Sequence, residues 1–408
     1  MTEAAQQQSP RAMVDYPMVD ADCHYYEPDD CYTRHMEAKY ADDAIMVVRG
    51  LSKHAQVHFR GERIGFFAAP PGEFAGRPGS YKAFYEGKAS KGEHILAADP
   101  ISCFELPESM ERDARLEWLD EHNVEAGLFL PSLGVGVEMA LRDAGPEVVM
   151  ANHRAFNRWI QDDWGWSYQN RIFSVAQLSL VDIDLAVAEL ERVLKEGAKL
   201  VNLIPGPVMG RSPADPHFDP FWARCEEAGV PVAFHLGNAG FEELVSAAWG
   251  ENPRPQHHRV TAFQHMIGMM ERPVTDTLSA LIMHNLFGRF PNLRVLSIEN
   301  GSEWVKPLLG RLDKAAKVAG KNFTFGPIHD KPSRIFLDRI RVCPFPEDNI
   351  PRLIEAVGPE VAIFGSDWPH PEALADPIEF ADGLGGLNYE QVRKVMRGNT
   401  AKILGLAP

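Results

Sequence analysis

The sequence has few cysteines, and they are not arranged to hold a structure together. The five, Cys23, Cys31, Cys103, Cys225 and Cys343, are odd in number, scattered and without CxxC spacing. This pattern suits a reducing compartment better than it suits a disulfide framework or a thiolate zinc site. Residues 1–17 are polar and lack a positive start followed by an apolar run, so they do not resemble a secretion signal. We therefore expect a cytoplasmic protein.

Basic residues are also scarce. Lysine and arginine number 41 against 57 acidic residues, which gives a formal net charge of −16 at pH 7, and no dense basic cluster occurs. An acidic surface repels phosphate backbones, so we expect no nucleic-acid partner. No stretch approaches the roughly 20 consecutive apolar residues of a membrane span, so we expect no membrane partner either. We expect a small-molecule substrate and a homodimer or homotetramer.

The chain does contain repeated alternation of apolar strands and helical segments. Helical spacing is clear at 110–122, 182–196 and 348–357, and Asp182 is placed to cap the second of these. The strand candidates are residues 18–24, 124–130, 172–177, 199–204, 231–236, 293–298, 339–343 and 361–365. Eight strands, each followed by helical chain, predict an α/β fold of the (β/α)8 TIM-barrel type. A doubly wound sheet is the alternative, but no glycine-rich phosphate loop follows any strand.

Domain organisation follows from the same pattern. We predict a disordered or arm-like tail at 1–17 and one barrel domain at 18–408. The barrel is distorted by an insertion after the first strand, at about 32–107, which is rich in loops and compatible with a small hairpin. Within it, basic and aromatic residues could form a lid over an aromatic acid, although such residues more often only cover a surface: Arg60, Arg63, Phe66, Phe67 and Tyr85.

Polar residues stand where several predicted strands end. Asp22 and His24 end the first strand and share one face, His235 ends the fifth, Glu299 follows the sixth and Asp367 follows the eighth. In a barrel these ends meet at one mouth. Carboxylates and imidazoles together suit Zn²⁺, Mn²⁺ or Fe²⁺. Each residue also has a structural alternative: a polar strand end, a core histidine, or an Asx-turn at Asp367.

Four segments resemble the amidohydrolase superfamily. They are Val19–His24 (VDADCH), Phe234–Gly237 (FHLG), Leu286–Leu293 (LFGRFPNL) and Phe364–His370 (FGSDWPH). More narrowly, they are similar to the "amidohydrolase 2" branch, which holds aminocarboxymuconate-semialdehyde and resorcylate-type decarboxylases together with many uncharacterised hydrolases. The resemblance covers nearly the whole chain outside the insertion.

The resemblance implies a metal set and two departures from the family pattern. The implied ligands are Asp22, His24, His235 and Asp367, around one divalent ion, with zinc preferred over manganese or iron. The usual first-strand pair is His-x-His, whereas Asp22 stands first here. The related decarboxylases keep a catalytic histidine at the end of the sixth strand, where this chain has Glu299. A glutamate does not donate as a cationic imidazole does, so the departure favours hydrolysis.

We therefore predict a metal-dependent hydrolase of a small cyclic or aromatic substrate. A divalent cation lowers the pKa of a bound water from near 15.7 to roughly 7–9, and Asp367 would act as the general base. Glu299 would orient the water or bind a substrate hydroxyl, or it would only bond helix amides near Ser302. A nonoxidative decarboxylase of an aromatic or unsaturated acid is the first alternative. A non-catalytic barrel that binds a ligand is the second.

A further group of histidines lies between the fifth and sixth strands. We predict that His284 could supply the missing acid and that His257, His258 and His265 bind substrate if the loop after His235 covers the mouth. Helix-face or solvated positions are their alternative. His370 would contact substrate or the metal ligands, or it would serve a turn. Three other residues are expected to be structural: Trp304, Arg289 and Phe290.

Overall fold

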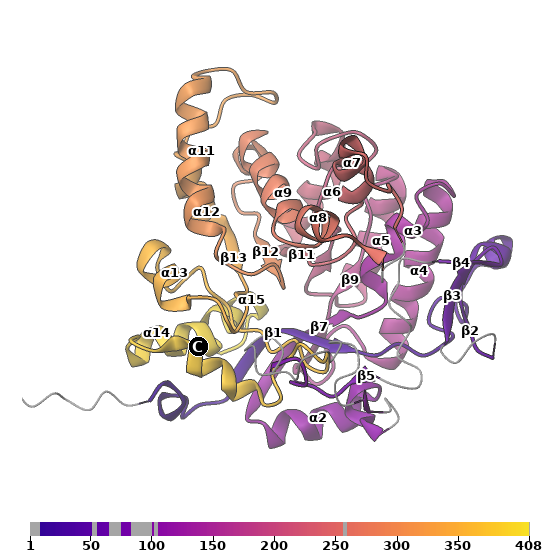
Figure 1. Ribbon diagram of the computed structural model, residues 1–408, viewed down its shortest axis with the longest axis horizontal. Helices are drawn as coiled ribbons and strands as arrows, with labels where there is room; N and C mark the ends of the chain where they lie inside the picture. The colour runs from indigo at the N-terminus through magenta and orange to yellow at the C-terminus, as the bar shows by residue number, and fades with distance from the viewer. Residues whose placement is uncertain are drawn as a thin grey trace, which may run out of the picture.

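A ring of parallel strands forms the centre of the fold (Figure 1). The computed structural model describes residues 9–50, 55–64, 75–82, 100–101, 105–255 and 259–407. The strands of the ring are β1 Met18–Tyr25, β7 Val124–Pro131, β8 Ile172–Ser174, β9 Ala176–Gln177, β10 Val201–Asn202, β11 Val232–His235, β12 Val295–Ile298 and β13 Ile340–Val342. They pair in chain order as β1-β7-β8 and as β9-β10-β11-β12-β13.

Backbone hydrogen bonds join these two sheets at both ends. Val175, between β8 and β9, donates to the carbonyl of residue 129, and Ala176, at the start of β9, donates to that of residue 200, so one continuous segment serves both sheets. On the other side, Ile363 donates to Val342 of β13 at 2.9 Å, and Ala21 of β1 donates to Phe364 at 2.8 Å. The predicted eighth strand at 361–365 therefore closes the ring, although it pairs too briefly to form a regular strand. The predicted distorted (β/α)8 barrel is confirmed.

Helices cover the outside of the ring (Figure 1). The longer ones are α2 Arg112–Glu121, α4 Pro146–Asp163, α5 Ile183–Lys195, α6 Asp219–Ala228, α9 Arg272–Met283, α11 Val305–Ala319, α12 Pro332–Arg339, α13 Ile350–Val357 and α15 Asn399–Leu404. Short helices are α3 Val137–Ala140, α7 Phe241–Leu244, α8 Ala262–Gln264, α10 Leu286–Arg289 and α14 Tyr389–Arg393, with η10 His265–Met269 after α8 and η11 Pro377–Leu384 before α14.

The predicted helix starts are partly right. Asp182 caps α5 through a 3.0 Å hydrogen bond from the amide of Leu185. The helix expected from residue 348 begins two residues later, because Asn349 is its cap and accepts from the amide of Arg352. The Asp348 side chain instead accepts hydrogen bonds from the backbone amide and hydroxyl of Ser302.

Two apolar clusters stabilise the barrel. Side chains from successive strands fill the interior of the ring, among them Val19, Leu128, Val175 and Leu296, joined by Leu404 of α15. A larger cluster packs the outer faces of the strands against the helices. The ring is therefore a packed core rather than a pore, and the polar residues lie at the carboxyl ends of its strands.

The insertion after β1 contains the predicted hairpin. Strands β2 Ile45–Val48, β3 Gln56–Phe59 and β4 Glu62–Arg63 form an antiparallel sheet, and β5 Ala75–Gly76 pairs with β6 Pro100–Ile101. The small sheet lies at one edge of the molecule beside α4 (Figure 1), where the Ile45 amide donates to Asn152. The described cysteines, at positions 23, 31, 225 and 343, are free and buried.

Part of the N-terminal segment packs against the barrel domain as an arm. Arg11 forms an ion pair with Asp382 of η11, and Met13 is buried. Residues 1–8 lie outside the described residues. In the described part of the chain, no helix has both the length and the apolar character needed to cross a bilayer.

Candidate active site

An irregularity in β1 sets the direction of the first two site residues. Val19 and Ala21 belong to the interior cluster, whereas Cys23 packs in the outer cluster. The alternation of faces therefore changes between Ala21 and Asp22, where the pairing of β1 with β7 shifts register. Bulges of this kind redirect side chains next to active sites. Asp22 and His24 consequently share the face that opens on the barrel mouth.

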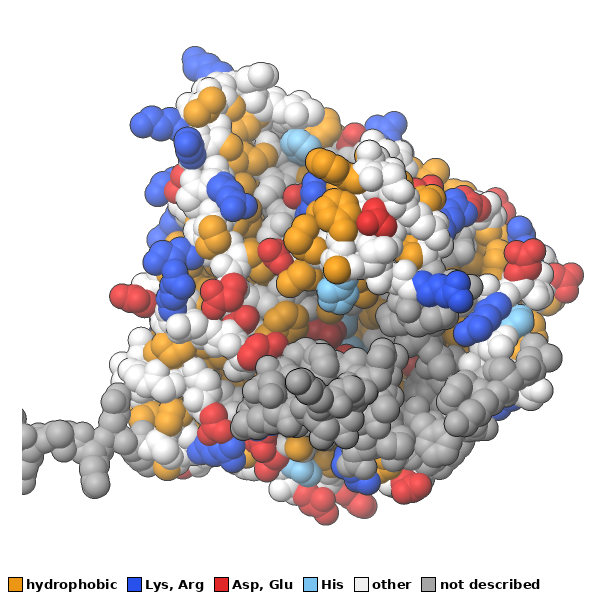
Figure 2. All heavy atoms as spheres, viewed as in Figure 1, with side chains coloured by type: hydrophobic (Ala, Val, Ile, Leu, Met, Phe, Trp, Pro, Cys, Tyr) orange, Lys and Arg blue, Asp and Glu red, His pale blue; other side chains and the backbone are white. Residues whose placement is uncertain are grey.

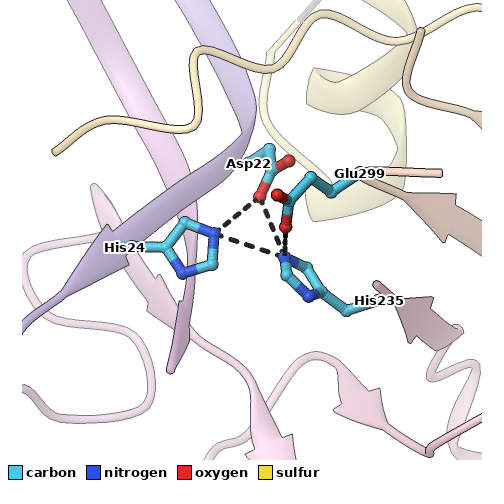
Figure 3. Close-up of side chains that lie close together, drawn as sticks. All are labelled: Asp22, His24, His235 and Glu299. Carbon is cyan, nitrogen blue, oxygen red and sulfur yellow. Dashed lines mark hydrogen bonds and ion pairs between the residues drawn. The ribbon is translucent and has the colours of Figure 1, made fainter. Parts of the chain in front are cut away.

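Four side chains converge at this mouth (Figure 3). Nε2 of His24 lies 3.2 Å from Oδ1 of Asp22 and 3.2 Å from Nε2 of His235. Nε2 of His235 lies 3.0 Å from Oε2 of Glu299 and 3.6 Å from Oδ1 of Asp22. Asp367 completes the group, with Oδ1 3.3 Å from Nε2 of His24. We refer to these five residues as the cradle.

The donor chemistry of the cradle fits a cation. Nδ1 of His24 lies 3.2 Å from the carbonyl of Pro131, and Nδ1 of His235 lies 2.6 Å from the carbonyl of Leu236. Because a carbonyl only accepts, both Nδ1 atoms carry hydrogen, and in the neutral rings both Nε2 atoms present lone pairs. Those lone pairs face one another and carboxylate oxygens. A divalent ion held by these residues would satisfy the acceptors that otherwise face one another.

The two imidazoles experience opposite electrostatic effects. Burial and the charge of nearby His370 lower the pKa of His24 from 6.5 to about 3, which keeps the ring neutral and able to bind a metal. Burial also opposes the charged form of His235, but the Glu299 and Asp22 carboxylates raise the pKa of His235 well above its ordinary value. The His235 ring thus holds its second proton only because negative charge surrounds it, and a bound cation would replace that proton.

The carboxylates of the site repel one another. Burial, followed by the charges of Glu299 and Glu372, raises the pKa of Asp367 well above its ordinary value. Burial also opposes ionisation of Asp22, but the contacts with His235 and His24 outweigh it and lower the pKa of Asp22. Acceptor oxygens of Glu299, Asp367 and Glu372 lie within 4.8 Å of one another. This concentration of negative charge is compatible with a bound divalent ion.

Asp367 is oriented by His370. Nδ1 of His370 lies 2.8 Å from Oδ1 of Asp367, and Nε2 lies 2.8 Å from the hydroxyl of Ser132. That hydroxyl donates to the carbonyl of Tyr25. The His370 ring also packs on His24, with centroids 4.1 Å apart. His370 therefore contacts the predicted ligand set rather than serving only a turn.

Glu299 points into the cradle instead of bonding the helix start beyond it. The alternative role near Ser302 is taken by Asp348. Glu299 and Asp367 both adopt positive φ angles, 55° and 60° respectively, which non-glycine residues rarely adopt. Backbone strain of this type concentrates at functional sites, and here it aims two carboxylates at one place.

A cavity of about 1230 Å³ opens above the cradle. Asp22, Glu299, Asp367 and Glu372 lie at its floor, and α9 and α11 form its walls. Figure 2 shows this face of the molecule hollowed between α11 and the α7–α9 segment, with hydrophobic side chains on both sides. Such a cavity is large enough for a small organic molecule.

The remaining predicted histidines do not gather around the cradle. His284 directly follows α9. Its Nδ1 bonds the hydroxyl of Ser212 at 2.8 Å, the ring packs on Phe325, and the residue does not line the cavity. The acid role expected of His284 therefore has no geometric support. His265 begins η10, is exposed and lines the cavity. Residues His257 and His258 lie outside the described residues.

The three residues expected to be structural make packing and backbone contacts away from the cradle. Arg289 binds both Asp219 of α6 and the carbonyl of Ala214, and Phe290 is nearly buried. Trp304 donates to the carbonyls at 300 and 301, and it also lines the cavity. Of the expected lid, Arg60 pairs with Asp43 of the insertion and Arg63 lies in β4, while Phe66, Phe67 and Tyr85 lie outside the described residues.

Sequence reasoning missed three residues at the site. Oδ1 of Asp20 accepts from the amides of Asp22 and Ser366, both at 3.0 Å, and so joins the two chain segments that carry the cradle. An acidic residue inside an apolar strand was the available signal. Glu372 was visible as a carboxylate after the eighth strand. Arg115 of α2 donates to the carbonyl of His24, and nothing in the sequence separates it from a surface arginine.

Comparison with solved structures finds the same fold in known proteins. An amidohydrolase from Mycobacterium avium subsp. paratuberculosis K-10 is 35% identical, with a TM-score of 0.87 over 96% of this chain and 100% of its own. The 5-carboxyvanillate decarboxylase LigW from Sphingomonas paucimobilis is 21% identical, with a TM-score of 0.58 over 72% and 82%. A 5-carboxyvanillate decarboxylase from Novosphingobium aromaticivorans DSM 12444, complexed with manganese and 4-hydroxy-3-methoxy-5-nitrobenzoic acid, is 14% identical, with a TM-score of 0.58 over 96% and 97%.

The family assignment rests on the length of the match as well as on this similarity. The family model described as Amidohydrolase matches residues 19–406, which include the strand ends that form the cradle. The resemblance found in the four sequence segments is therefore confirmed. The chain belongs to the amidohydrolase family and is a metal-dependent enzyme of that superfamily.

Proposed function

We propose that this enzyme hydrolyses an amide, ester or lactone of a cyclic or aromatic compound. The observation that carries the proposal is that Asp367 lies both in the cradle and at the floor of the substrate cavity. Its Oδ1 contacts Nε2 of His24 in the cradle, and the residue also lies at the floor of the cavity. A carboxylate between the metal ligands and the substrate space is where a general base is needed.

The proposed roles follow from the contacts. Asp22, His24 and His235 would hold the divalent ion together with Asp367. When bound, that ion supplies an activated water and polarises the substrate carbonyl. Oδ1 of Asp367 accepts from Nδ1 of His370 and faces Nε2 of His24 on the side where the ion would be held, so Oδ2 would accept a proton from water and pass it to the leaving group.

Glu299 and His370 would position these groups. Oε2 of Glu299 lies 3.0 Å from Nε2 of His235, and the other oxygen is free to accept from a water or a substrate hydroxyl. His370 would fix the plane of the Asp367 carboxylate through its 2.8 Å contact, with Ser132 holding the opposite ring nitrogen. His265 would contact substrate from the cavity wall.

We propose zinc as the ion. The cradle has two imidazoles and carboxylates, a set that binds zinc well but also accepts manganese, the metal present in the Novosphingobium decarboxylase. Elemental analysis of the purified protein should find about one divalent ion per chain, mostly zinc. A protein that contains manganese and gains activity with it would overturn the zinc assignment.

The reaction is tested by turnover in ¹⁸O-labelled water. Substrates are first screened among aromatic amides, esters, lactones and carboxylic acids. Hydrolysis places label in the product and releases no CO₂. An Asp367→Asn variant with retained metal should lose this incorporation. Stoichiometric CO₂ without label would instead establish decarboxylation.

Nonoxidative decarboxylation of an aromatic or unsaturated acid is the second candidate. Two arginines, Arg272 and Arg311, line the cavity and could hold a carboxylate, and decarboxylases of similar fold are known. Protonation of a ring carbon needs a positioned acid, and Glu299 occupies the place where the related enzymes keep a histidine. A Glu299→His variant that gains CO₂ release would favour this candidate.

A further inference from the structure

The cavity continues away from the cradle as a groove between two helices. One face of α9 lines it through Arg272, Thr275, Ser279 and Met283, at helical spacing. One face of α11 lines it through Leu308, Arg311, Leu312 and Ala315. The two helices are neighbours on the same side of the ring (Figure 1). We call this space the α9–α11 groove.

The middle of the groove is apolar and adaptable. Leu308 and Leu312 line the α11 wall, while Met269, Met270 and Met283 line the opposite side. Methionine side chains are flexible and polarisable, so they fit apolar ligands of varied shape. Met270 is 46% exposed, which leaves its side chain free to contact such a ligand. This section of the groove is suited to a hydrocarbon or aromatic segment.

Side chains of both charges line the groove. Glu299, Asp367 and Glu372 lie at the floor, whereas the walls carry Arg272 and Arg311 together with Glu271 and Asp276. Arg272 is partly neutralised by Asp276, 3.4 Å away on the same helix. In the part of the chain that the structure describes, Arg311 has neither an ion pair nor a hydrogen bond. An uncompensated guanidinium on a cavity wall favours a bound carboxylate or phosphate.

The groove is also long. Arg311 lies seven residues beyond Trp304, which is about 10 Å along an α-helix, and Trp304 follows closely after Glu299 of the cradle. The whole cavity, at about 1230 Å³, exceeds the roughly 300–1,000 Å³ typical of sites for drug-sized ligands. A single-ring substrate at the cradle would leave the α9–α11 groove empty.

We infer that the substrate is elongated, with an apolar middle section in the α9–α11 groove and an anionic group held by Arg311. This inference rests on the proposed function of the cradle, where the reacting group would lie. The inferred substrate is thus an amphipathic compound rather than a small single-ring one, and its carboxylate or phosphate lies far from the bond that is hydrolysed. Arg311 is thus a specificity-determining residue.

Binding of unreactive acids to the full-length, metal-loaded protein tests the inference. Isothermal titration calorimetry would compare decanedioate, decanoate and butanedioate. Decanedioate can place one carboxylate at the cradle and the other at Arg311, so we expect it to bind about tenfold tighter than decanoate. Butanedioate is too short to reach both sites and should bind weakly.

Variants locate the effect. Arg311→Met should remove the advantage of decanedioate over decanoate, and Arg311→Lys should keep part of it. Lys314→Met removes the same charge from α11 at an exposed position outside the cavity lining, so it should keep the full advantage. Equal loss in both variants, or no loss in Arg311→Met, would overturn the inference.

Two further outcomes are distinguishable from these. If no hydrolysis is found but the Arg311-dependent advantage persists, the proposed reaction fails and the binding groove stands. If the groove is instead covered by a second copy of the chain, sedimentation velocity should show that Arg311→Met changes the association state, and decanedioate should have no advantage. That result would overturn the inference.

We expect instead that Arg311→Met has the sedimentation coefficient of the wild type, and that the wild type binds decanedioate more tightly than decanoate. Organic phosphates of matched length, titrated in the same way, would show which anion Arg311 prefers.

Discussion

The buried arginine beneath the cradle offers a quantitative test of how the site is supported. Arg115 is fully buried, and no carboxylate in the described part of the chain pairs with it. Its Nη2 donates to the carbonyl of His24 at 2.8 Å and its Nε donates to that of Glu108 at 2.6 Å. The guanidinium also lies 4.2 Å from the centre of the Trp368 ring. Replacing Arg115 with methionine keeps the apolar stem and removes both hydrogen bonds and this ring contact, along with longer contacts to the rings of Trp118, Phe129 and Trp164.

The opposing contributions can be estimated. Two hydrogen bonds from a charged donor contribute about 3–6 kcal/mol together, and the desolvated cation–π contact about 2 kcal/mol. Against these, burial lowers the pKa of Arg115 from 12.5 to about 10, a cost of about 3 kcal/mol that methionine removes. The difference predicts that Arg115→Met lowers the free energy of unfolding by about 2–5 kcal/mol. Because the His24 carbonyl loses its donor, metal affinity should also fall about tenfold or more.

Urea unfolding and metal titration would check this prediction. Arg334→Met is the matched control, because that guanidinium is 68% exposed and, among the described residues, its side chain pairs only with Asp338 one turn away. This variant should change stability by less than about 0.5 kcal/mol. An Arg115→Met protein as stable as wild type would refute the reasoning, since it would mean that relief of the buried charge offsets the lost hydrogen bonds.

Three other perturbations have defined outcomes. His235→Ala should abolish metal binding and activity together while far-ultraviolet circular dichroism stays unchanged; full metal occupancy by mass spectrometry would contradict its role as a ligand. Asp367→Asn keeps an oxygen ligand but removes the base, so turnover should fall by about 10²- to 10⁴-fold with metal partly retained, and near-normal turnover would exclude the role. Burial raises the pKa of Glu27 from 4.5 to about 7, so the folded protein binds the proton more tightly than the unfolded chain does. The free energy of unfolding should therefore fall by about 3 kcal/mol as the pH rises from 4.5 to about 7. Glu27→Gln should flatten this fall in unfolding measured at pH 5 and pH 8, and an unchanged pH dependence would refute it.

The barrel could be predicted because each strand is a short apolar run that ends in polar residues. The predicted positions of Asp22, His24, His235 and Asp367 depended only on strand ends meeting at one mouth, and the structure brings all four together. The change of face in β1 could not be predicted, because nothing in the sequence marks the register shift. A regular strand would have turned Asp22 and His24 away from Val19 and Ala21.

The errors concern contacts between distant segments. The alternative role that the sequence left open for Glu299, a bond near Ser302, belongs to Asp348, because the chain after β13 returns to the start of α11. His284 is drawn to Ser212, which lies far away in the sequence. Helical spacing predicts which face of a helix a residue occupies, but it does not predict which distant segment packs on that face. The histidines between the fifth and sixth strands therefore could not be assigned a catalytic role from the sequence.

The closing segment of the barrel has a consequence for the time course of synthesis. Ser366 donates to Asp20 across a separation of 346 positions, and Asp367 donates its amide to the carbonyl of Asp22. Until that late segment has left the ribosome, β1 and β13 are unpaired edges of an open sheet, and edges of this kind recruit other chains. The cradle also lacks one of its carboxylates for the same period. Nascent chains should therefore acquire metal affinity only at the end of translation, and chains halted before residue 361 should be prone to aggregation.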